Sequence, residues 1–453
     1  MRKRSKKGLY LAIGGVLGVA ALGYFIFTAE AFEREKPKIA IQDKIYWNLK
    51  KPLKLTLTDN SGIKSYQVVI SDGKKRETID TATLSNPLKK IEIAIKQPAT
   101  LEFPQNRATL SINVQDKSFW NYFLGNRAHK DVQIIIDRQK PDLFIVTNSY
   151  SITKGGSALA VFHCTDDNLD KFFIKTNFGK KFLAQPFYKK GYYVALIAWP
   201  ITQKSFRADI IAFDKAGNKS RAHIPLYLKN RTYKQSVIHL TESFLKGKVE
   251  SLAEEYPETK GMSPLEKFKF VNETLRKKNE ELLHRLSSKV PQERISNFDI
   301  RPFYPLKNAA PVASFGDHRF YYYQGQLVSQ SYHMGLDLAS IKHAPIKASN
   351  PGLVVFANYN GIYGNMPLIS HGLGLYTLYG HCSALFIKKG EKVRRGEVIA
   401  KTGRTGLALG DHLHFGVLVQ GIEVRPAEWM DKKWIKDHVT TIMKEAKKVI
   451  DTE

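Results

Sequence analysis

The feature that most constrains the fold is a long uncharged segment close to the N-terminus, which runs from Gly8 to Ala29 and consists mainly of Leu, Ile, Val, Ala, Gly and Phe. About 20 helical residues, each rising ~1.5 Å, cross a hydrocarbon core of ~30 Å, so the segment is long enough for one membrane span. The basic residues just before it are Arg2, Lys3, Arg4, Lys6 and Lys7. Because basic residues stay on the cytoplasmic side of a membrane, the chain after Ala29 is expected to be exported.

A cleaved signal peptide is the other interpretation of residues 1–35. Ala29-Glu30-Ala31 provides the small residues of a cleavage site. The apolar segment is nevertheless longer than the roughly 7 to 15 residues of a signal-peptide core. We therefore expect a cytoplasmic basic tail and a retained membrane anchor in residues 1–35, with cleavage left open.

The charge and the cysteine content narrow the choice of partners and metals. The formal net charge of +28 favours an anionic partner, such as nucleic acid, acidic lipid or an anionic wall polymer. Export argues against nucleic acid. The two cysteines, Cys164 and Cys382, are too few for a disulfide scaffold or a four-cysteine zinc site. Any metal site is therefore expected to use His and carboxylate ligands.

Two β modules are predicted after the anchor, over residues 36–137 and 138–231. Short runs of strand-forming residues, such as Leu53 to Leu57 and Gln133 to Ile136, alternate with Asp, Asn and Gly turn signals. Thr58-Asp59-Asn60 is echoed by Thr165-Asp166-Asp167-Asn168, and the run from Ile112 to Lys117 by the run from Ile210 to Lys215. Because the echoes lie about 100 residues apart, the length of one immunoglobulin-like sandwich, we expect tandem immunoglobulin-like modules that act as spacers or bind a protein partner.

The hydrophobic period changes to that of helices near Thr232, so residues 232–299 are predicted to form a helical bridge. Ser263-Pro264-Leu265-Glu266 is a capping box with proline at the first helical position. Apolar residues then follow at the spacing of one helical face: Leu265, Phe268, Val271, Leu275, Leu282 and Leu286. The bridge is interpreted either as an arm that packs against its neighbours or as an autoinhibitory lid over the site described next.

Histidines concentrate toward the C-terminal end, where seven of the 13 lie between His318 and His414. His333 and Asp337 form an H-x-x-x-D pattern, and His412 and His414 form H-x-H. Residues i and i+2 of a strand project from the same face, and Gly335 would let the backbone of the first pattern approach the second. Two imidazoles and one carboxylate would leave a zinc ion with an open position for water. On these patterns alone, histidines scattered through an ordinary β domain remain equally plausible.

A more specific pattern is the order of four short motifs. His333-Met334-Gly335-Leu336-Asp337, then Tyr379-Gly380-His381, then Gly403-Arg404-Thr405-Gly406, then His412-Leu413-His414-Phe415 resemble the signatures of the lysostaphin-type zinc metallo-endopeptidases of bacterial cell walls. The resemblance spans about residues 306 to 428. It implies a mostly antiparallel β domain at 300–430, which leaves 431–453 as a C-terminal helical tail.

The resemblance also implies the roles of single residues. His333, Asp337 and His414 would bind Zn2+, while His381 and His412 would be catalytic. It leaves open which of the two catalytic histidines is the base. His371 is not expected to take part directly in the chemistry, and His318 and His343 are expected to be surface or wall residues.

The sequence departs from the family pattern at two places. Relatives carry Ser-Thr-Gly-Pro before H-x-H, whereas this chain has Ala408-Leu409-Gly410-Asp411, which puts the loop and the substrate groove in doubt. Cys382 follows His381 where relatives usually have Leu. Its thiol is interpreted as a small apolar side chain, with a redox-sensitive neighbour of the site as the alternative.

The sequence thus predicts a mainly β, envelope-anchored hydrolase. The resemblance implies that it cleaves peptide cross-links of peptidoglycan, with peptide stems as substrate and the bulk of the chain on the periplasmic or extracytoplasmic side of the inner or cytoplasmic membrane. The alternative function is a non-enzymatic envelope regulator that activates a separate cell-wall hydrolase. Such a regulator would be expected to lack a metal or catalytic residue, and all five are present.

Overall fold

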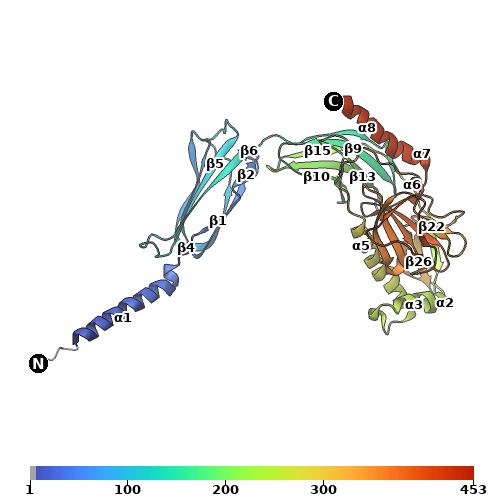
Figure 1. Ribbon diagram of the computed structural model, residues 1–453, viewed down its shortest axis with the longest axis horizontal. Coiled ribbons are helices and arrows are strands. Elements are labelled where there is room, and N and C mark those ends of the chain that lie inside the picture. Colours follow the sequence, from blue (N-terminus) through green and yellow to red (C-terminus); the bar gives the residue numbers. More distant parts are fainter. Residues whose placement is uncertain (1–6, 453) are drawn as a thin grey trace. The chain divides into compact units, whose positions relative to one another are not determined.

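The computed structural model describes residues 7–452. The predicted basic tail, with Arg2, Lys3, Arg4 and Lys6, lies outside these residues apart from Lys7. The chain divides into two compact units (Figure 1). The first extends to Lys140 and includes Asn168–Asp170 and Phe213–Lys219, and the second holds the rest of the chain. Strands dominate both units, which confirms the mainly β class.

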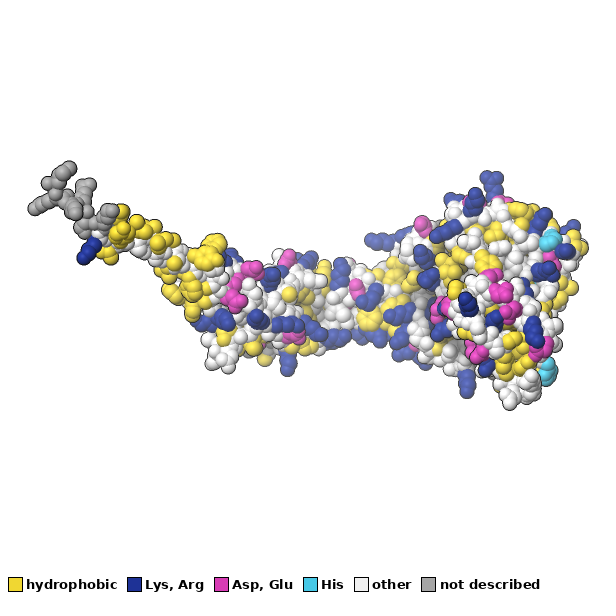
Figure 2. All heavy atoms as spheres, turned by 90° about the horizontal axis from the view of Figure 1, so that it is seen from below, with side chains coloured by type: hydrophobic (Ala, Val, Ile, Leu, Met, Phe, Trp, Pro, Cys, Tyr) yellow, Lys and Arg dark blue, Asp and Glu magenta, His cyan; other side chains and the backbone are white. Residues whose placement is uncertain are grey.

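The N-terminal apolar segment forms helix α1, Lys7–Thr28, which none of the described residues buries. Its mean hydropathy of 2.0 and its 22 residues suit a membrane span, a test that signal sequences also pass. Figure 2 shows its exposed hydrophobic side chains. The short turn η1, Glu30–Phe32, follows. Phe119 donates its backbone N–H to Ala31 O, so the segment after α1 is joined to the first β module.

The first β module is one six-stranded sheet in the order β1-β3-β5-β6-β2, with β4 paired to β3. The strands are β1 Lys38–Ala40, β2 Lys44–Trp47, β3 Leu53–Ser71, β4 Arg76–Ile95, β5 Arg107–Asp116 and β6 Arg127–Ile136. Side chains alternate between the core and the surface along β5, as expected for a strand with one buried face. The core includes Leu57, Val68, Ile112 and Ile134.

The second β module consists of two four-stranded sheets, β11-β10-β14-β15 and β12-β13-β9-β7. The strands are β7 Asp142–Asn148, β9 Ser157–Thr165, β10 Leu169–Thr176, β11 Lys181–Phe182, β12 Gln185–Pro186, β13 Tyr192–Ala198, β14 Ala208–Asp214 and β15 Lys219–His223. Two further short strands, β8 Ser151–Thr153 and β16 Tyr227–Lys229, pair with each other in parallel. β8 lies between β7 and β9 in the sequence, and β16 follows β15. The immunoglobulin-like fold of the two modules stays a prediction.

The first residues of the bridge form a strand. The prediction that helical structure begins near Thr232 is therefore wrong, because the first helical segment begins at Glu242. Strand β17, Gln235–His239, pairs in parallel with β19, because the edge of β19 offers unpaired backbone groups. Helical segments follow: α2 Glu242–Phe244, η2 Leu245–Val249, α3 Glu250–Ala253, η3 Pro257–Thr259, α4 Pro264–Lys269, η4 Phe270–Leu275 and α5 Arg276–Leu286. The predicted capping box at Ser263 and Glu266 is confirmed.

The apolar face of these helices packs onto the C-terminal sheet. Phe268, Val271, Leu275 and Leu283 share one buried cluster with sheet residues such as Leu368, Leu378 and Leu418. In Figure 1, α5 runs beside this sheet. The expectation that the bridge packs against its neighbours is therefore confirmed.

The C-terminal domain is built on an eight-stranded sheet in the order β18-β21-β29-β25-β24-β23-β27, with β30 paired to β29. Its strands are β18 Ala310–Ala313, β21 Leu336–Ala339, β23 Gly352–Tyr359, β24 Asn365–Ser370, β25 Leu375–Gly380, β27 Lys392–Val393, β29 Leu413–Val419 and β30 Ile422–Val424. Smaller sheets contain β19 His318–Tyr323, β20 Gln326–Tyr332, β22 Pro345–Lys347, β26 Ala384–Leu385 and β28 Val398–Lys401, and η5, Gly361–Tyr363, precedes β24. All pairings in the large sheet are antiparallel, as the resemblance implied.

The C-terminal tail is helical and returns to the second β module. After α6, Pro426–Trp429, which ends the peptidase domain, the tail comprises α7 Lys432–Ile435, η6 Lys436–Thr440 and α8 Thr441–Thr452. Thr147 Oγ1 donates to Ile442 O at 3.2 Å, and Ser149 Oγ donates to His438 O at 2.9 Å. Gln420 Nε2 donates to Leu183 O at 2.8 Å. These bonds join the second module and the C-terminal domain within one unit.

Candidate active site

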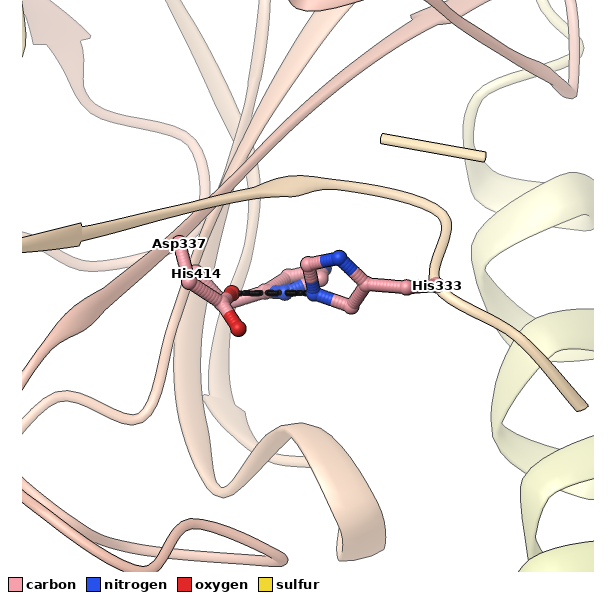
Figure 3. A group of neighbouring side chains, drawn as sticks. All are labelled: His333, Asp337 and His414. Carbon is pink, nitrogen blue, oxygen red and sulfur yellow. Dashed lines mark hydrogen bonds and ion pairs between the residues drawn. The ribbon is translucent and has the colours of Figure 1, made fainter. Parts of the chain in front are cut away.

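Neighbouring strands of the large sheet bring the sequence-predicted site residues together. Asp337 on β21 pairs directly with His414 on β29, and Gly380 at the end of β25 pairs with His414 from the other side. His381 therefore follows β25 beside His414. His333 lies just after β20, and its side chain points toward Asp337 and His414 (Figure 3).

Three of these side chains converge closely. His333 Nε2 lies 3.0 Å from Asp337 Oδ1 and 3.1 Å from His414 Nδ1. His414 Nδ1 lies 2.8 Å from Asp337 Oδ1. All three residues are buried. The structure thus gathers the three residues expected to bind zinc.

The donor atoms of this group suit a metal cation. His333 Nδ1 lies 2.9 Å from the backbone oxygen of Ser314, which can only accept a hydrogen bond, so Nδ1 carries the proton. Nε2 of His333 then presents a lone pair toward Asp337 Oδ1, another acceptor. A cation between them would satisfy both, and two imidazoles with one carboxylate form a zinc donor set that leaves one position open. The carbonyl of Ser314 orients the His333 ring, as backbone carbonyls commonly do for histidines that bind metals.

Gly335 is needed for this convergence. A Cβ atom at position 335 would lie 2.4 Å from Cε1 and 2.4 Å from Nε2 of His414. No side chain fits there while His414 keeps its position. The expectation that Gly335 permits a close approach of the backbone is confirmed.

His381 and His412 lie side by side at the edge of this group, with ring centroids 4.8 Å apart. His381 Nδ1 lies 2.8 Å from Thr405 O, and His412 Nδ1 lies 2.9 Å from Gly410 O. Each carbonyl can only accept, so each Nδ1 carries a proton, and in the neutral ring the lone pair is on Nε2. Burial lowers the pKa of His381 to about 3, with further lowering by His414 and His412.

Their backbones explain part of this arrangement. His381 has a φ of 65°, a left-handed conformation that turns the chain at the end of β25. His412 precedes β29 and pairs with Gly403 in an isolated bridge. Its Nε2 lies 3.7 Å from Asp337 Oδ2, so it faces the same acidic group as the other histidines.

Asp411 is the residue that sequence reasoning missed, although it directly precedes H-x-H. Its Oδ1 accepts a hydrogen bond from Thr402 Oγ1 at 2.6 Å, and its Oδ2 accepts from the backbone N–H of His343 at 3.2 Å. These bonds hold the loop that carries His412. The signal in the sequence was the departure Ala408-Leu409-Gly410-Asp411, where a carboxylate stands in place of the family's proline.

The remaining candidates lie apart from the group. Both ring nitrogens of His371 have hydrogen-bond partners, Pro351 O at 2.8 Å and Thr377 Oγ1 at 2.7 Å. These bonds fix the ring in place, which fits a structural role. His318 lies 3.0 Å from Gln330 Oε1, and His343 lies 3.0 Å from Ser383 Oγ. The Cys382 thiol is fully buried and burial raises its pKa, which fits the apolar interpretation.

Comparisons with known proteins assign the family of this domain. Residues 331–426 match Peptidase family M23. The chain is 37% identical over 138 residues to "DD-carboxypeptidase/endopeptidase Mpg" of Neisseria meningitidis, a match that covers 30% of each chain. It is 34% identical over 149 residues to "Peptidoglycan DD-endopeptidase ShyA" of Vibrio cholerae, over 32% of this chain and 30% of that protein.

A solved structure of similar sequence is the catalytic domain of lysostaphin from Staphylococcus simulans. The identity is 25% and the TM-score 0.24, over 27% of this chain and 92% of that one. The matches to the two curated relatives, Mpg and ShyA, each cover less than a third of the relative's length. The resemblance to the lysostaphin-type family is confirmed, and the chain carries an M23 peptidase domain.

Proposed function

We propose that this protein is a zinc-dependent endopeptidase that hydrolyses peptide cross-links of peptidoglycan in the bacterial envelope. The observation that carries the proposal is the convergence of His333, Asp337 and His414 beside two further histidines, His381 and His412, whose Nδ1 atoms are bonded to backbone carbonyls. The M23 match and the names of the two curated relatives support the reaction and the substrate class.

His333, Asp337 and His414 would hold the metal. A zinc ion bound there would polarise the scissile carbonyl and lower the pKa of a bound water. His381 and His412 present Nε2 lone pairs at the open side of the group, so one can accept a proton from the attacking water. The other can donate to the oxyanion or to the leaving amine once it is protonated. Their fixed Nδ1 protons keep both rings in the tautomer that this exchange requires.

Helix α1 supports a location at the membrane. A retained anchor would hold the chain at the inner or cytoplasmic membrane, with the modules at 36–137 and 138–231, the bridge at 232–299, the peptidase domain at 300–430 and the tail at 431–453 on the exported side. The predominance of Lys and Arg suits an anionic wall polymer (Figure 2). The β modules offer surfaces for a protein partner.

Digestion of purified muropeptides tests the proposal. The full chain in detergent micelles should release new amino termini inside the cross-link, detected by mass spectrometry. A chelator should stop the reaction and added Zn2+ should restore it. Intact muropeptides from a folded, zinc-loaded protein would instead favour the non-enzymatic regulator that activates a separate hydrolase.

A further inference from the structure

The first β module contains a group of acidic side chains that is separate from the candidate active site. Glu33 lies between η1 and β1, Asp59 lies on β3, and Asp116 ends β5. Carboxylate oxygens of the three residues lie within 4.8 Å of one another. Asp59 is 8% exposed and Asp116 is 0% exposed. Two of the three charges are therefore removed from water.

No positive side chain compensates these charges. Among residues 7–452, Lys, Arg and His form no ion pair with Glu33, Asp59 or Asp116. Burial of unpaired carboxylates is strongly unfavourable, and the mutual repulsion of three adds to the cost. A cation is the missing partner.

Asp59 supplies the observation that points to a ligand. Its Oδ1 accepts hydrogen bonds from Ser61 N, Ser61 Oγ and Gly62 N at 2.7 to 2.9 Å. Its Oδ2 is buried and has no hydrogen-bond partner. A buried carboxylate oxygen without a donor, in a residue grouped with two other carboxylates, is available to bind a metal.

Asn126 fixes the other two members of the group. Asn126 donates its backbone N–H to Asp116 Oδ1 at 2.8 Å and its side-chain amide to Asp116 Oδ2 at 2.7 Å. The same amide donates to Glu33 O at 2.9 Å, which holds the segment after α1 against the module.

The same arrangement recurs farther along the chain. Asn218 donates its backbone N–H to Asp214 Oδ1 at 2.8 Å and its amide to Asp214 Oδ2 at 2.8 Å and to Asp137 O at 2.9 Å. Asp116 and Asp214 are the equivalent residues of the internal sequence echo. The two aspartates are therefore held in the same way, although Asn126 lies 10 residues after Asp116 and Asn218 lies 4 residues after Asp214.

We propose that Glu33, Asp59 and Asp116 bind a calcium ion, which fastens the segment after the N-terminal helix to the first β module. The available ligands are all oxygen atoms, which hard cations prefer, and Ca2+ tolerates the irregular geometry of carboxylates from three separate segments. Exported modules bind Ca2+ with a Kd of about 10⁻⁴ to 10⁻³ M, the range expected here. Because Glu33 follows η1 directly, the bound ion restricts the motion of the module relative to its connection with α1.

Equilibrium dialysis with radioactive calcium tests the site. The full chain in detergent micelles, freed of divalent ions other than zinc, should bind Ca2+ saturably in the stated range. Asp59→Asn should bind one Ca2+ fewer per chain, because the amide removes the charge of the unpartnered oxygen. Glu33→Gln, on the partly exposed linker, should weaken the same binding event by about tenfold or more, since it removes a charged ligand.

A matched variant and a second readout complete the experiment. Asp131→Asn makes the same chemical change at a side chain that is 56% exposed in the same module, and should keep the wild-type calcium count. Ca2+ should slow tryptic cleavage after Arg34 in the wild type and in Asp131→Asn, but not in Asp59→Asn. The proposal is overturned if the wild type binds no Ca2+, or if folded Asp59→Asn and Glu33→Gln both keep its number and affinity.

Discussion

Asp337 and His414 face each other across two antiparallel strands, and His414 Nδ1 lies 2.8 Å from Asp337 Oδ1. Because the pairing of β21 with β29 fixes the backbones of both residues, the sheet determines the distance between Asp337 and His414. His333 is then the one member of the group that comes from a connecting segment, after β20. Its orientation depends on the hydrogen bond to Ser314 O.

Metal binding and proton transfer should separate when single histidines are replaced. His414→Ala should lose most of its zinc and all activity, because two protein ligands are too few to hold the ion. His381→Ala and His412→Ala should keep near-normal zinc and folding but lose roughly 10² or more in rate, since each removes a proton-transfer group. Metal analysis and muropeptide digestion measure both effects. If His412→Ala lost zinc while His414→Ala kept it, His412 would be the metal ligand and His414 the proton-transfer group, the reverse of the proposed roles.

Gly335→Ala should displace the His414 ring, because the added methyl group would lie 2.4 Å from two of its atoms. We expect a strong loss of zinc affinity, measured by competition with a chromogenic chelator. Gly410→Ala is the matched control, since its Cβ would meet nothing within 4 Å although it lies two residues before His412. Equal zinc affinity in the two variants would contradict the close approach at Gly335.

The bridge helices should behave as part of the peptidase core. Leu275→Ala, in the cluster shared with β24, β25 and β29, should cost about 2 to 5 kcal/mol of unfolding free energy. Lys277→Ala, at an exposed position of α5, should be nearly neutral. Denaturant unfolding of the full chain measures both.

A chain that begins at Ile300 also distinguishes the two interpretations of the bridge. Because it exposes the apolar sheet face that the helices cover, it should unfold more readily and aggregate. A stable fragment that cleaves muropeptides faster than the full chain would instead support the autoinhibitory lid.

His371 should make the stability of the protein depend on pH. Burial lowers its pKa from 6.5 to about 4. The neutral folded form contributes fully above pH 6.5, and this contribution is lost as the pH falls toward 4, because the unfolded chain binds the proton first. The loss is up to about 3 kcal/mol. His371→Gln should flatten this part of the profile of unfolding free energy against pH, measured by denaturant unfolding at a series of pH values.

Local patterns predicted the parts of the fold that depend on neighbouring residues. The apolar length of α1, the capping box at Ser263 and the glycine at 335 each follow from a few adjacent side chains. The gathering of His333, Asp337, His381, His412 and His414 was expected from the ordered motifs of a known family. Only His414 of the H-x-H pair lies within β29, however, so the prediction that both histidines lie on one strand is wrong for His412. Both rings still face Asp337.

The missed features depend on contacts between distant segments. Asp411 acquires its role from Thr402 and His343, and β17 becomes a strand because β19 offers a free edge. The hydrogen bonds from Gln420 to Leu183 and from Ser157 N to Glu428 join residues more than 200 positions apart. The spacing of hydrophobic residues along the sequence does not indicate contacts between such distant segments.

The return of the C-terminal tail to the second β module has a practical consequence for protein engineering. A graft of residues 300–430 onto another protein would cut the bonds of Gln420 and Glu428 and remove α8, whose buried Ile442, Ala446 and Ile450 lie on its inner face. A graft that keeps these bonds would therefore need the second β module and the C-terminal tail as well as residues 300–430.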